Sequence, residues 1–81
     1  MTTVSLSQMR VGDRGTVIGF EDDSLISHRI EEMGVTPGES IEVIRFAPLG
    51  DPMEVKIRGY LLSLRLKEAQ MIKVSLKKSS A

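Results

Sequence analysis

The sequence MEVKIRGYLLSL, residues 53–64, decides the fold of this chain. Its first part, Met53–Ile57, alternates strictly between apolar and charged residues, and this period of two is typical of a strand with one buried face. Arg58-Gly59 then predicts a tight turn. The alternation resumes after this turn and continues to residue 66. We therefore expect two short adjacent strands that each turn one face toward a hydrophobic core.

Three further segments have the composition of short strands: Thr16–Phe20, Ser40–Phe46 and Ile72–Leu76. Apolar residues on both faces of the second favour a central position in the sheet, and Gly19 in the first indicates either a β-bulge or a close backbone approach. Residues 4–11 are expected to be an apolar lead-in before a turn at residues 12–15, and Lys67–Gln70 a short helical turn. The pattern predicts a mainly β fold, a small five-stranded SH3-like barrel, because so many strands in a short chain must curl or leave exposed edges.

One convincing helix is expected between the first two strands, over Ser24–Met33. Acidic residues precede it, and Ser24 is a suitable cap for its first turn. Gly34 suits the left-handed position after a helix, and Pro37 follows as a stop signal. The face that we expect to be buried consists of Ile26, Ile30 and Met33.

Composition excludes several kinds of chemistry. The chain has no Cys, so disulfides, thiolate metal sites and Cys nucleophiles are absent. A single His, at position 28, leaves no His pair for a catalytic metal. One Tyr, two Phe and no Trp are too few for a base-stacking surface. We therefore expect a protein that is not an enzyme and that needs no cofactor.

The 81 residues suffice for one domain, which we place at residues 1–76, with a short C-terminal tail at 77–81. No apolar run predicts a membrane span and no signal peptide is visible, so we expect a cytoplasmic protein without direct membrane insertion. The net charge is zero, but residues 1–54 hold 10 of the 11 acids and residues 55–81 hold 7 of the 11 bases. The basic half is either a patch for an anionic partner or a set of solvated strand faces.

Several ordered pieces of the chain together resemble the FeoA family of small cytoplasmic proteins associated with bacterial ferrous iron uptake. These pieces are Leu6 with Gly12-Asp13-Arg14-Gly15, Arg29 with Met33-Gly34-Val35-Thr36-Pro37-Gly38, Ala47–Pro52, Leu62–Arg65, and Glu68-Ala69 with Ile72–Val74. The resemblance implies an SH3-like barrel that acts with FeoB, a membrane ferrous iron transporter with a cytosolic GTP-binding domain. The chain departs from the family at Met33, where Leu is usual; this exchange conserves volume.

The resemblance thus implies a non-enzymatic accessory or regulatory protein of ferrous iron uptake that binds the cytosolic part of FeoB. Two alternatives remain open at this point. Residues 11–17 also resemble strand-leading loops of ribosomal SH3-like modules, which suggests a small RNA-binding module, although the neutral charge argues against nucleic acid. An Fe²⁺ carrier is the other alternative. The exposed strand edges leave weak self-association open.

Two segments are candidate partner-binding sites. Two prolines and a glycine stiffen the loop Ala47–Pro52, so an exposed Leu49 is a preorganised apolar anchor, flanked by Pro48, Gly50 and Asp51. On the helix, Leu25 lies off the apolar stripe, and Arg29 follows one turn later. The alternative is that both leucines pack on the barrel and that Arg29 pairs with an acid.

A metal site is not expected. His28 with Glu31 and Glu32 shares one helix face, but so few exposed ligands make a weak and unselective site. The glycines at 12 and 15 do not form a phosphate loop, because the Gly-Lys-Ser/Thr ending is missing.

Overall fold

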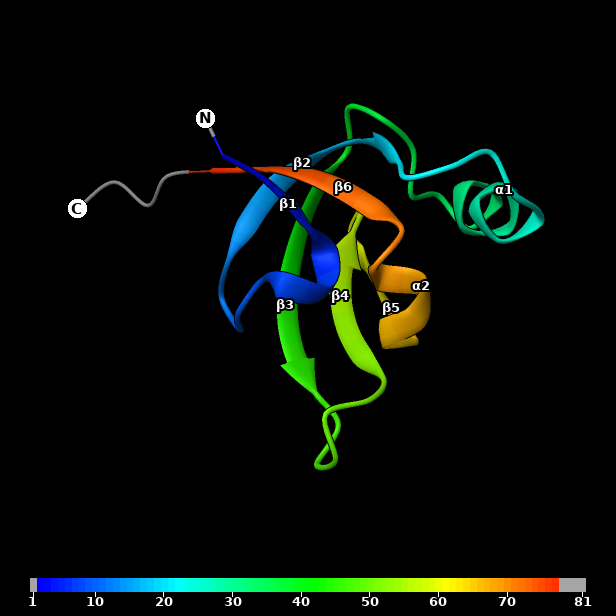
Figure 1. Ribbon diagram of the computed structural model, residues 1–81. Helices are drawn as coiled ribbons and strands as arrows, with labels where there is room; N and C mark the ends of the chain where they lie inside the picture. Colours follow the sequence, from blue (N-terminus) through cyan, green and yellow to red (C-terminus); the bar gives the residue numbers. More distant parts are fainter. Residues whose placement is uncertain (1, 78–81) are drawn as a thin grey trace.

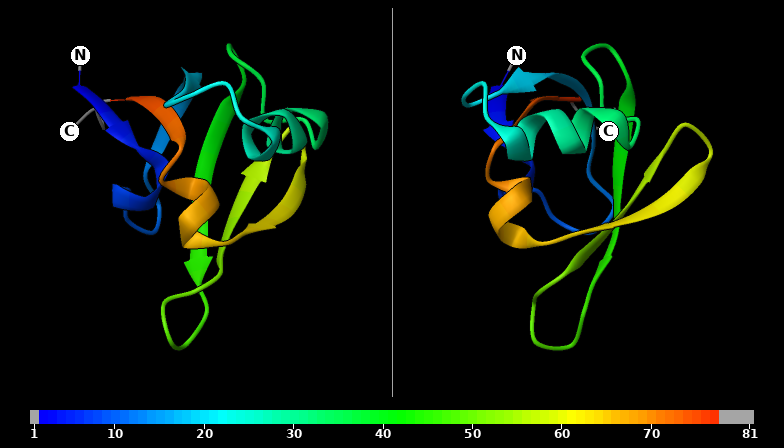
Figure 2. Two further views of the ribbon diagram at one scale, coloured as in Figure 1. Left: turned by 45° about the vertical axis from the view of Figure 1, so that its right-hand side comes forward. Right: turned by 90° about the vertical axis from the view of Figure 1, so that its right-hand side faces the viewer.

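The computed structural model describes residues 2–77 and shows a mainly β protein (Figure 1). In chain order, the elements of this part are β1 (Thr2–Ser5), the 3₁₀-helix η1 (Leu6–Gln8), β2 (Arg14–Phe20), α1 (Leu25–Glu32), β3 (Ser40–Phe46), β4 (Met53–Ile57), β5 (Tyr60–Leu64), α2 (Leu66–Ala69) and β6 (Ile72–Leu76). The strands form one antiparallel sheet in the order β1-β6-β2-β3-β4-β5. The sheet curls around the core (Figure 2).

Four details of the expected fold are wrong. The described residues contain six strands rather than five, because Thr2–Ser5, which overlaps the start of the expected lead-in, pairs with β6. The helix consequently lies between β2 and β3, which are the second and third strands. No pairing joins the edge strands β1 and β5 within the described residues, so the sheet is not closed. Leu66 lies in α2 and does not extend the alternating strand.

The buried face of β4 is as predicted, whereas in β5 only Leu64 is fully buried and Tyr60 is 43% exposed. Met53, Val55 and Ile57 of β4 are at most 1% exposed. They pack with residues from both ends of the chain in one apolar cluster, whose other buried members are Leu6, Met9, Val17, Ile30, Val35, Ile41, Val43, Leu64, Ala69, Ile72 and Val74. The short elements η1 and α2 lie against each other and cover one end of this core. Since removal of apolar surface from water is the main favourable term in folding, this cluster holds the domain together.

Bulges bend the two long strands. In β2, Val17 pairs with Val74 and Gly19 with Lys73, so one extra residue lies between them, and the predicted bulge at Gly19 is confirmed. In β3, Ile44 is the extra residue between the pairs formed by Val43 and Arg45. A bulge shifts the alternation by one position. This shift explains why the apolar pattern of β3 changes face halfway, and β3 is central as expected, between β2 and β4.

The predicted turn at residues 12–15 is displaced. The turn is closed by the Asp13 N–H, which donates to the Arg10 carbonyl at 2.9 Å, while Gly15 already belongs to β2. A Cβ at Gly15 would lie 2.6 Å from the Ser75 carbonyl oxygen, so glycine here allows β6 to lie close to β2. The Lys77 N–H donates to the Arg14 carbonyl at 2.9 Å, and the remainder of the predicted tail, residues 78–81, lies outside the described residues.

Candidate partner-docking surfaces

The loop Ala47–Pro52 projects beyond the sheet at the far end of β3 and β4 (Figure 1). Its base is closed by the Ala47 N–H, which donates to the Pro52 carbonyl at 2.9 Å. A tighter turn inside it is closed by the Gly50 N–H, which donates to the Ala47 carbonyl at 2.7 Å. Gly50 has a φ of 91°, a conformation that favours glycine. Two backbone hydrogen bonds and the left-handed conformation of Gly50 therefore fix the shape of the loop.

Leu49 at the tip of this loop is 96% exposed, so it does not pack on the barrel. Asp51 behaves differently, because its carboxylate Oδ1 accepts a hydrogen bond from the Leu66 N–H at 3.1 Å. This bond ties the loop to the first residue of α2. Of the residues predicted as contacts in this loop, Leu49 is therefore exposed to solvent, and Asp51 positions the loop that carries it.

Helix α1 begins with a reciprocal pair of serine hydrogen bonds. The Ser27 N–H donates to the Ser24 hydroxyl at 3.2 Å, and the Ser24 N–H donates to the Ser27 hydroxyl at 2.9 Å. This arrangement is a capping box in which serine takes the place of the usual acidic or amide side chain. Ser24 is therefore confirmed as the cap. Ser27 is 3% exposed, and its hydroxyl is satisfied by these bonds.

The C-terminus of α1 is a Schellman motif. The Gly34 N–H donates to the Glu31 carbonyl at 3.0 Å, and the Val35 N–H donates to the Ile30 carbonyl at 3.3 Å. Gly34 has a φ of 104°, so the predicted left-handed position is confirmed. Ile30 and Val35 are both fully buried, which gives this motif its usual apolar contact and fixes the end of the helix to the core.

A tyrosine from the hairpin also holds the end of α1. The Tyr60 hydroxyl in β5 donates a hydrogen bond to the Met33 carbonyl. A Cβ at Gly34 would lie 2.5 Å from this hydroxyl, so a larger residue there would displace the end of the Tyr60 side chain in addition to straining the backbone. The strand alternation alone gave no sign of this contact, since it connects elements far apart in sequence.

The exposed face of α1 carries the predicted residues. Leu25 is 87% exposed and does not pack on the barrel, and Arg29 is exposed as well. The ion pairs of the described residues do not include Arg29.

The prediction that Ile26 is buried is wrong, because Ile26 is 41% exposed and Ser27 faces the core in its place. The buried stripe is thus narrower than expected, and the apolar outer surface is larger.

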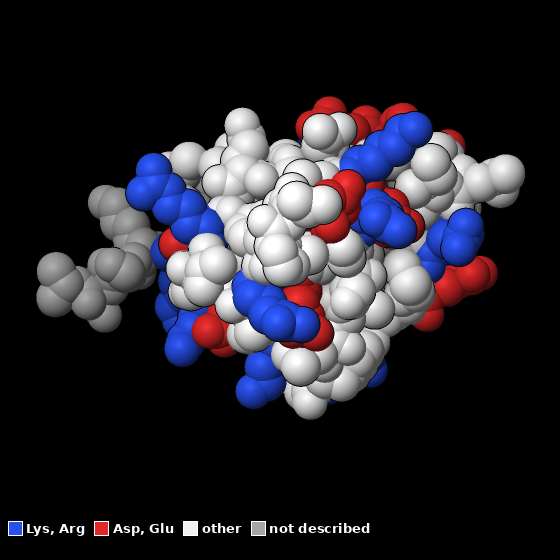
Figure 3. Space-filling view, turned by 90° about the horizontal axis from the view of Figure 1, so that it is seen from below, with Lys and Arg blue, Asp and Glu red and all other residues white. Residues whose placement is uncertain are grey.

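The structure does not bring the two predicted sites together. Loop Ala47–Pro52 and helix α1 lie at opposite ends of the sheet, as the views in Figures 1 and 2 agree, in a molecule that extends 39 × 30 × 22 Å. Figure 3 looks onto the end that carries the loop, where charged side chains of both signs surround an uncharged centre. A partner that contacts both leucines must therefore span the length of the domain.

His28 on α1 is paired with an acid. Its Nε2 lies 2.5 Å from Asp23 Oδ1, and both side chains are exposed. The hydrogen bond to Asp23 and the charge of that carboxylate raise the pKa of His28, with smaller contributions from Glu31 and Glu32. Within residues 2–77, the structure contains no cluster of three His, Asp or Glu side chains arranged to hold a metal ion.

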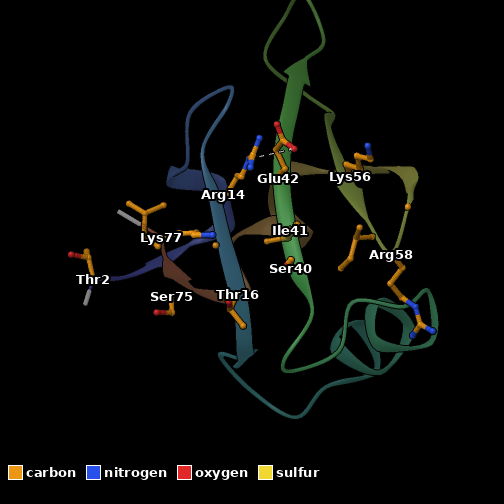
Figure 4. A pocket seen from close by; sticks show the side chains of 14 residues that line it. Thr2, Arg14, Thr16, Ser40, Ile41, Glu42, Lys56, Arg58, Ser75 and Lys77 are labelled. Carbon is orange, nitrogen blue, oxygen red and sulfur yellow. Dashed lines mark ion pairs between the residues drawn. The ribbon is translucent and has the colours of Figure 1, made fainter. Parts of the chain in front are cut away.

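A third surface, which sequence reasoning missed, is a groove of about 870 Å³ on the outer face of the sheet (Figure 4). Short hydroxyl side chains form its floor, and long charged side chains stand around it. The floor residues are Thr16, Ser40 and Ser75, and the charged residues are Arg14, Glu42, Lys56, Arg58 and Lys77. The alternation within each strand identifies the residues that point outward. The order of the strands, which the sequence does not provide, is needed to know that these residues form one surface.

These features define a small SH3-like β domain with two exposed leucines at opposite ends of its sheet. In the described part of the chain, no helix has the length and apolar character that a membrane crossing requires. The chain matches the model of the FeoA domain over residues 4–76, and it belongs to the FeoA family.

The relatives agree with this assignment. A Fe²⁺ transport protein A/Fe²⁺ transporter FeoB fusion protein from Porphyromonas gingivalis is 38% identical over 76 residues, which is 94% of this chain and 9% of the length of that relative. The FeoA-like protein from Clostridium acetobutylicum superposes with a TM-score of 0.92 at 34% identity, covering 100% of this chain and 95% of the other. FeoA from Stenotrophomonas maltophilia, described as a prokaryotic SH3 domain protein and solved with zinc, gives 0.76 at 25% identity, covering 93% and 91%.

Proposed function

We propose that this protein is a non-enzymatic accessory protein of bacterial ferrous iron uptake that binds the cytosolic part of the FeoB transporter. The fusion relative carries the proposal: in it, a domain 38% identical to this chain is covalently part of a protein named for both FeoA and FeoB. Covalent fusion keeps two domains at a high effective concentration, which is useful when they act together.

The exposed anchors suit such a role. Leu49 and Leu25 are 96% and 87% exposed, and each is carried by a segment whose backbone is already hydrogen-bonded in place. Little conformational entropy is then lost when either leucine enters a partner's apolar pocket. To bias FeoB between two states, the protein must bind one state more tightly than the other.

The test is a binding titration of this protein against detergent-solubilised full-length FeoB in three conditions: with a GTP analogue, with GDP and without nucleotide. Saturable binding supports the proposal, and a dependence on nucleotide identifies a regulator that distinguishes the states of the GTP-binding domain. Nucleotide-independent binding identifies an assembly subunit. The absence of saturable binding at micromolar concentrations in all three conditions would overturn the proposal.

Two variants identify the docking surface. Leu49→Asp and Leu25→Asp each place a charge where an apolar anchor stands, and neither removes core packing because both leucines are exposed. Loss of a central apolar anchor weakens binding by about thirtyfold or more, equivalent to about 2 kcal/mol. The matched control is Leu61→Asp, since Leu61 is 55% exposed on edge strand β5 and belongs to neither surface. If Leu61→Asp weakens FeoB binding as much as the other two variants do, neither the loop nor α1 is the docking surface.

A further inference from the structure

The groove on the outer face of the sheet is built from two rows of side chains. In one row, Thr16 pairs with Ser75 on one side and with Ser40 on the other. In the next row, Arg14 pairs with Glu42, and Glu42 with Lys56. Positions two apart on a strand share a face, so both rows point outward. A row of short hydroxyl side chains beside a row of long charged ones leaves the hollow seen in Figure 4.

The charge of this groove is mainly positive. Four of the fourteen residues that line it are basic, and Glu42 is the single acid among them. Arg14 pairs with Glu42 at 3.7 Å, and Arg58 pairs with Glu39 at 3.9 Å. Ion pairs this long at exposed positions contribute little stability, so a ligand can compete for both arginines.

Two lysines stand at opposite sides of the groove. Neither Lys56 nor Lys77 takes part in an ion pair with another described residue. Figure 4 places Lys77 on the β1/β6 side and Lys56 on the β4 side, with Arg14 and Glu42 between them. The path from β6 across β2 and β3 to β4 is three strand spacings, or about 14 Å at roughly 4.8 Å each. An extended peptide covers that distance with about four residues.

We propose that this groove binds a short, extended acidic peptide segment of a partner protein. Two acidic side chains four residues apart would meet Lys56 and Lys77, and the peptide backbone between them would cross Arg14 and Glu42, beside the row of hydroxyl side chains. The groove has the volume of a site for a ligand of this size.

The lining favours a peptide over a nucleic acid. None of the residues that line the groove is aromatic, so there is no platform on which bases could stack. Glu42 stands in the middle of the charged row, where it would repel a continuous chain of phosphates. A peptide with uncharged residues between two acids avoids that repulsion.

The probe is the labelled heptapeptide Gly-Glu-Ser-Thr-Ser-Glu-Gly, titrated into the isotope-labelled full chain and followed by amide chemical shifts. We expect saturable shifts at Thr16, Ser40 and Ser75. Two control peptides separate spacing from charge: Gly-Glu-Glu-Ser-Thr-Ser-Gly has the same composition with adjacent acids, and Gly-Gln-Ser-Thr-Ser-Gln-Gly has none. The spaced acidic peptide should bind about fivefold more tightly than the first control, and the second should not bind.

Variants locate the site. Lys56→Glu and Lys77→Glu should each weaken binding about fivefold or more. Lys67→Glu is the matched control, because Lys67 is exposed on α2 outside the groove and the change in net charge is the same. Glu42→Gln should strengthen binding, since it removes the acid that competes for Arg14. None of these side chains belongs to the core, so we expect all four variants to fold.

Three results would overturn the proposal: no saturable shift at millimolar peptide, equal weakening by Lys67→Glu and Lys56→Glu, or equal affinity for the two acidic peptides. Tighter binding of an oligouridylate, or of vesicles that contain phosphatidylglycerol, through the same residues would also overturn it. The test contains no FeoB, so its outcome is independent of the proposed function.

Discussion

Loop Ala47–Pro52 and helix α1 both present an exposed leucine, but they are held in different ways. The helix is anchored to the core, because Ile30 within it and Val35 just after it are both fully buried. The loop has no residue of its own in the core, and its shape depends on backbone hydrogen bonds and on Asp51. Damage to the core should therefore displace the α1 surface first, whereas the loop surface should respond to local polar changes.

The largest expected effect is that of Ile30→Ala. This change leaves a cavity beneath α1, and the loss of a buried Ile costs about 2–5 kcal/mol of unfolding free energy. Chemical denaturation followed by circular dichroism measures it. Ile26→Ala on the same helix is the control, with a loss below about 1 kcal/mol because Ile26 is 41% exposed. Similar losses for the two variants would contradict the packing of α1 described above.

A smaller effect is expected from Tyr60→Phe, which removes only the hydroxyl that donates to the Met33 carbonyl. The loss of one such hydrogen bond costs about 0.5–1.5 kcal/mol, and the exposure of Tyr60 places it toward the low end. Amide hydrogen exchange should become faster in the last turn of α1 and should stay unchanged in the loop. Faster exchange in Ala47–Pro52 as well would show that the two surfaces are coupled.

The loop has its own matched pair of variants. Asp51→Ala removes the acceptor of the Leu66 N–H, whereas Asp51→Asn keeps an acceptor oxygen at the same place. We expect Asp51→Ala to reduce the unfolding free energy by about 0.5–1 kcal/mol and to increase the mobility of Leu49, with Asp51→Asn close to the original protein. Backbone relaxation by nuclear magnetic resonance reads the mobility. If Asp51→Ala leaves Leu49 as rigid as before, the loop does not depend on this tether.

These two regions also show what the sequence could and could not predict. Local chemistry was sufficient where one segment determines its own shape. Ser24 and Gly34 mark the ends of α1. The alternation of Met53–Ile57 identifies the buried face of strand β4. Strand β1 was missed because Thr2 and Thr3 are exposed and its pairing depends on β6, more than sixty residues away. The same limit applies to the groove, whose rows combine residues from several strands.

The predicted site was partly accessible to sequence reasoning for a physical reason. Leu49 follows a proline and precedes a glycine, which stiffen its loop, and Leu25 lies off the helical stripe; both leucines are exposed. Asp51 was grouped with them by position alone, and its bond to Leu66 could not be predicted because α2 is far along the chain. Partner contact by these residues stays a prediction until the titration against FeoB is done.

The smallest expected effect concerns pH and the exposed face of α1. The Asp23 carboxylate raises the pKa of His28 above its ordinary value in the folded chain. A raised folded pKa means that the stabilisation from this pair is complete below the unfolded pKa of about 6.5 and is lost as the pH rises through the folded pKa. Asp23→Asn should bring the pKa of His28 back toward its ordinary value, as read from the imidazole proton shifts in a pH titration. Glu32→Gln, which removes a weaker charge contribution, should lower the pKa of His28 less than Asp23→Asn does. An unchanged pKa of His28 in Asp23→Asn would show that the pair does not persist in solution, and the polar side of the α1 surface would then be free to rearrange against a partner.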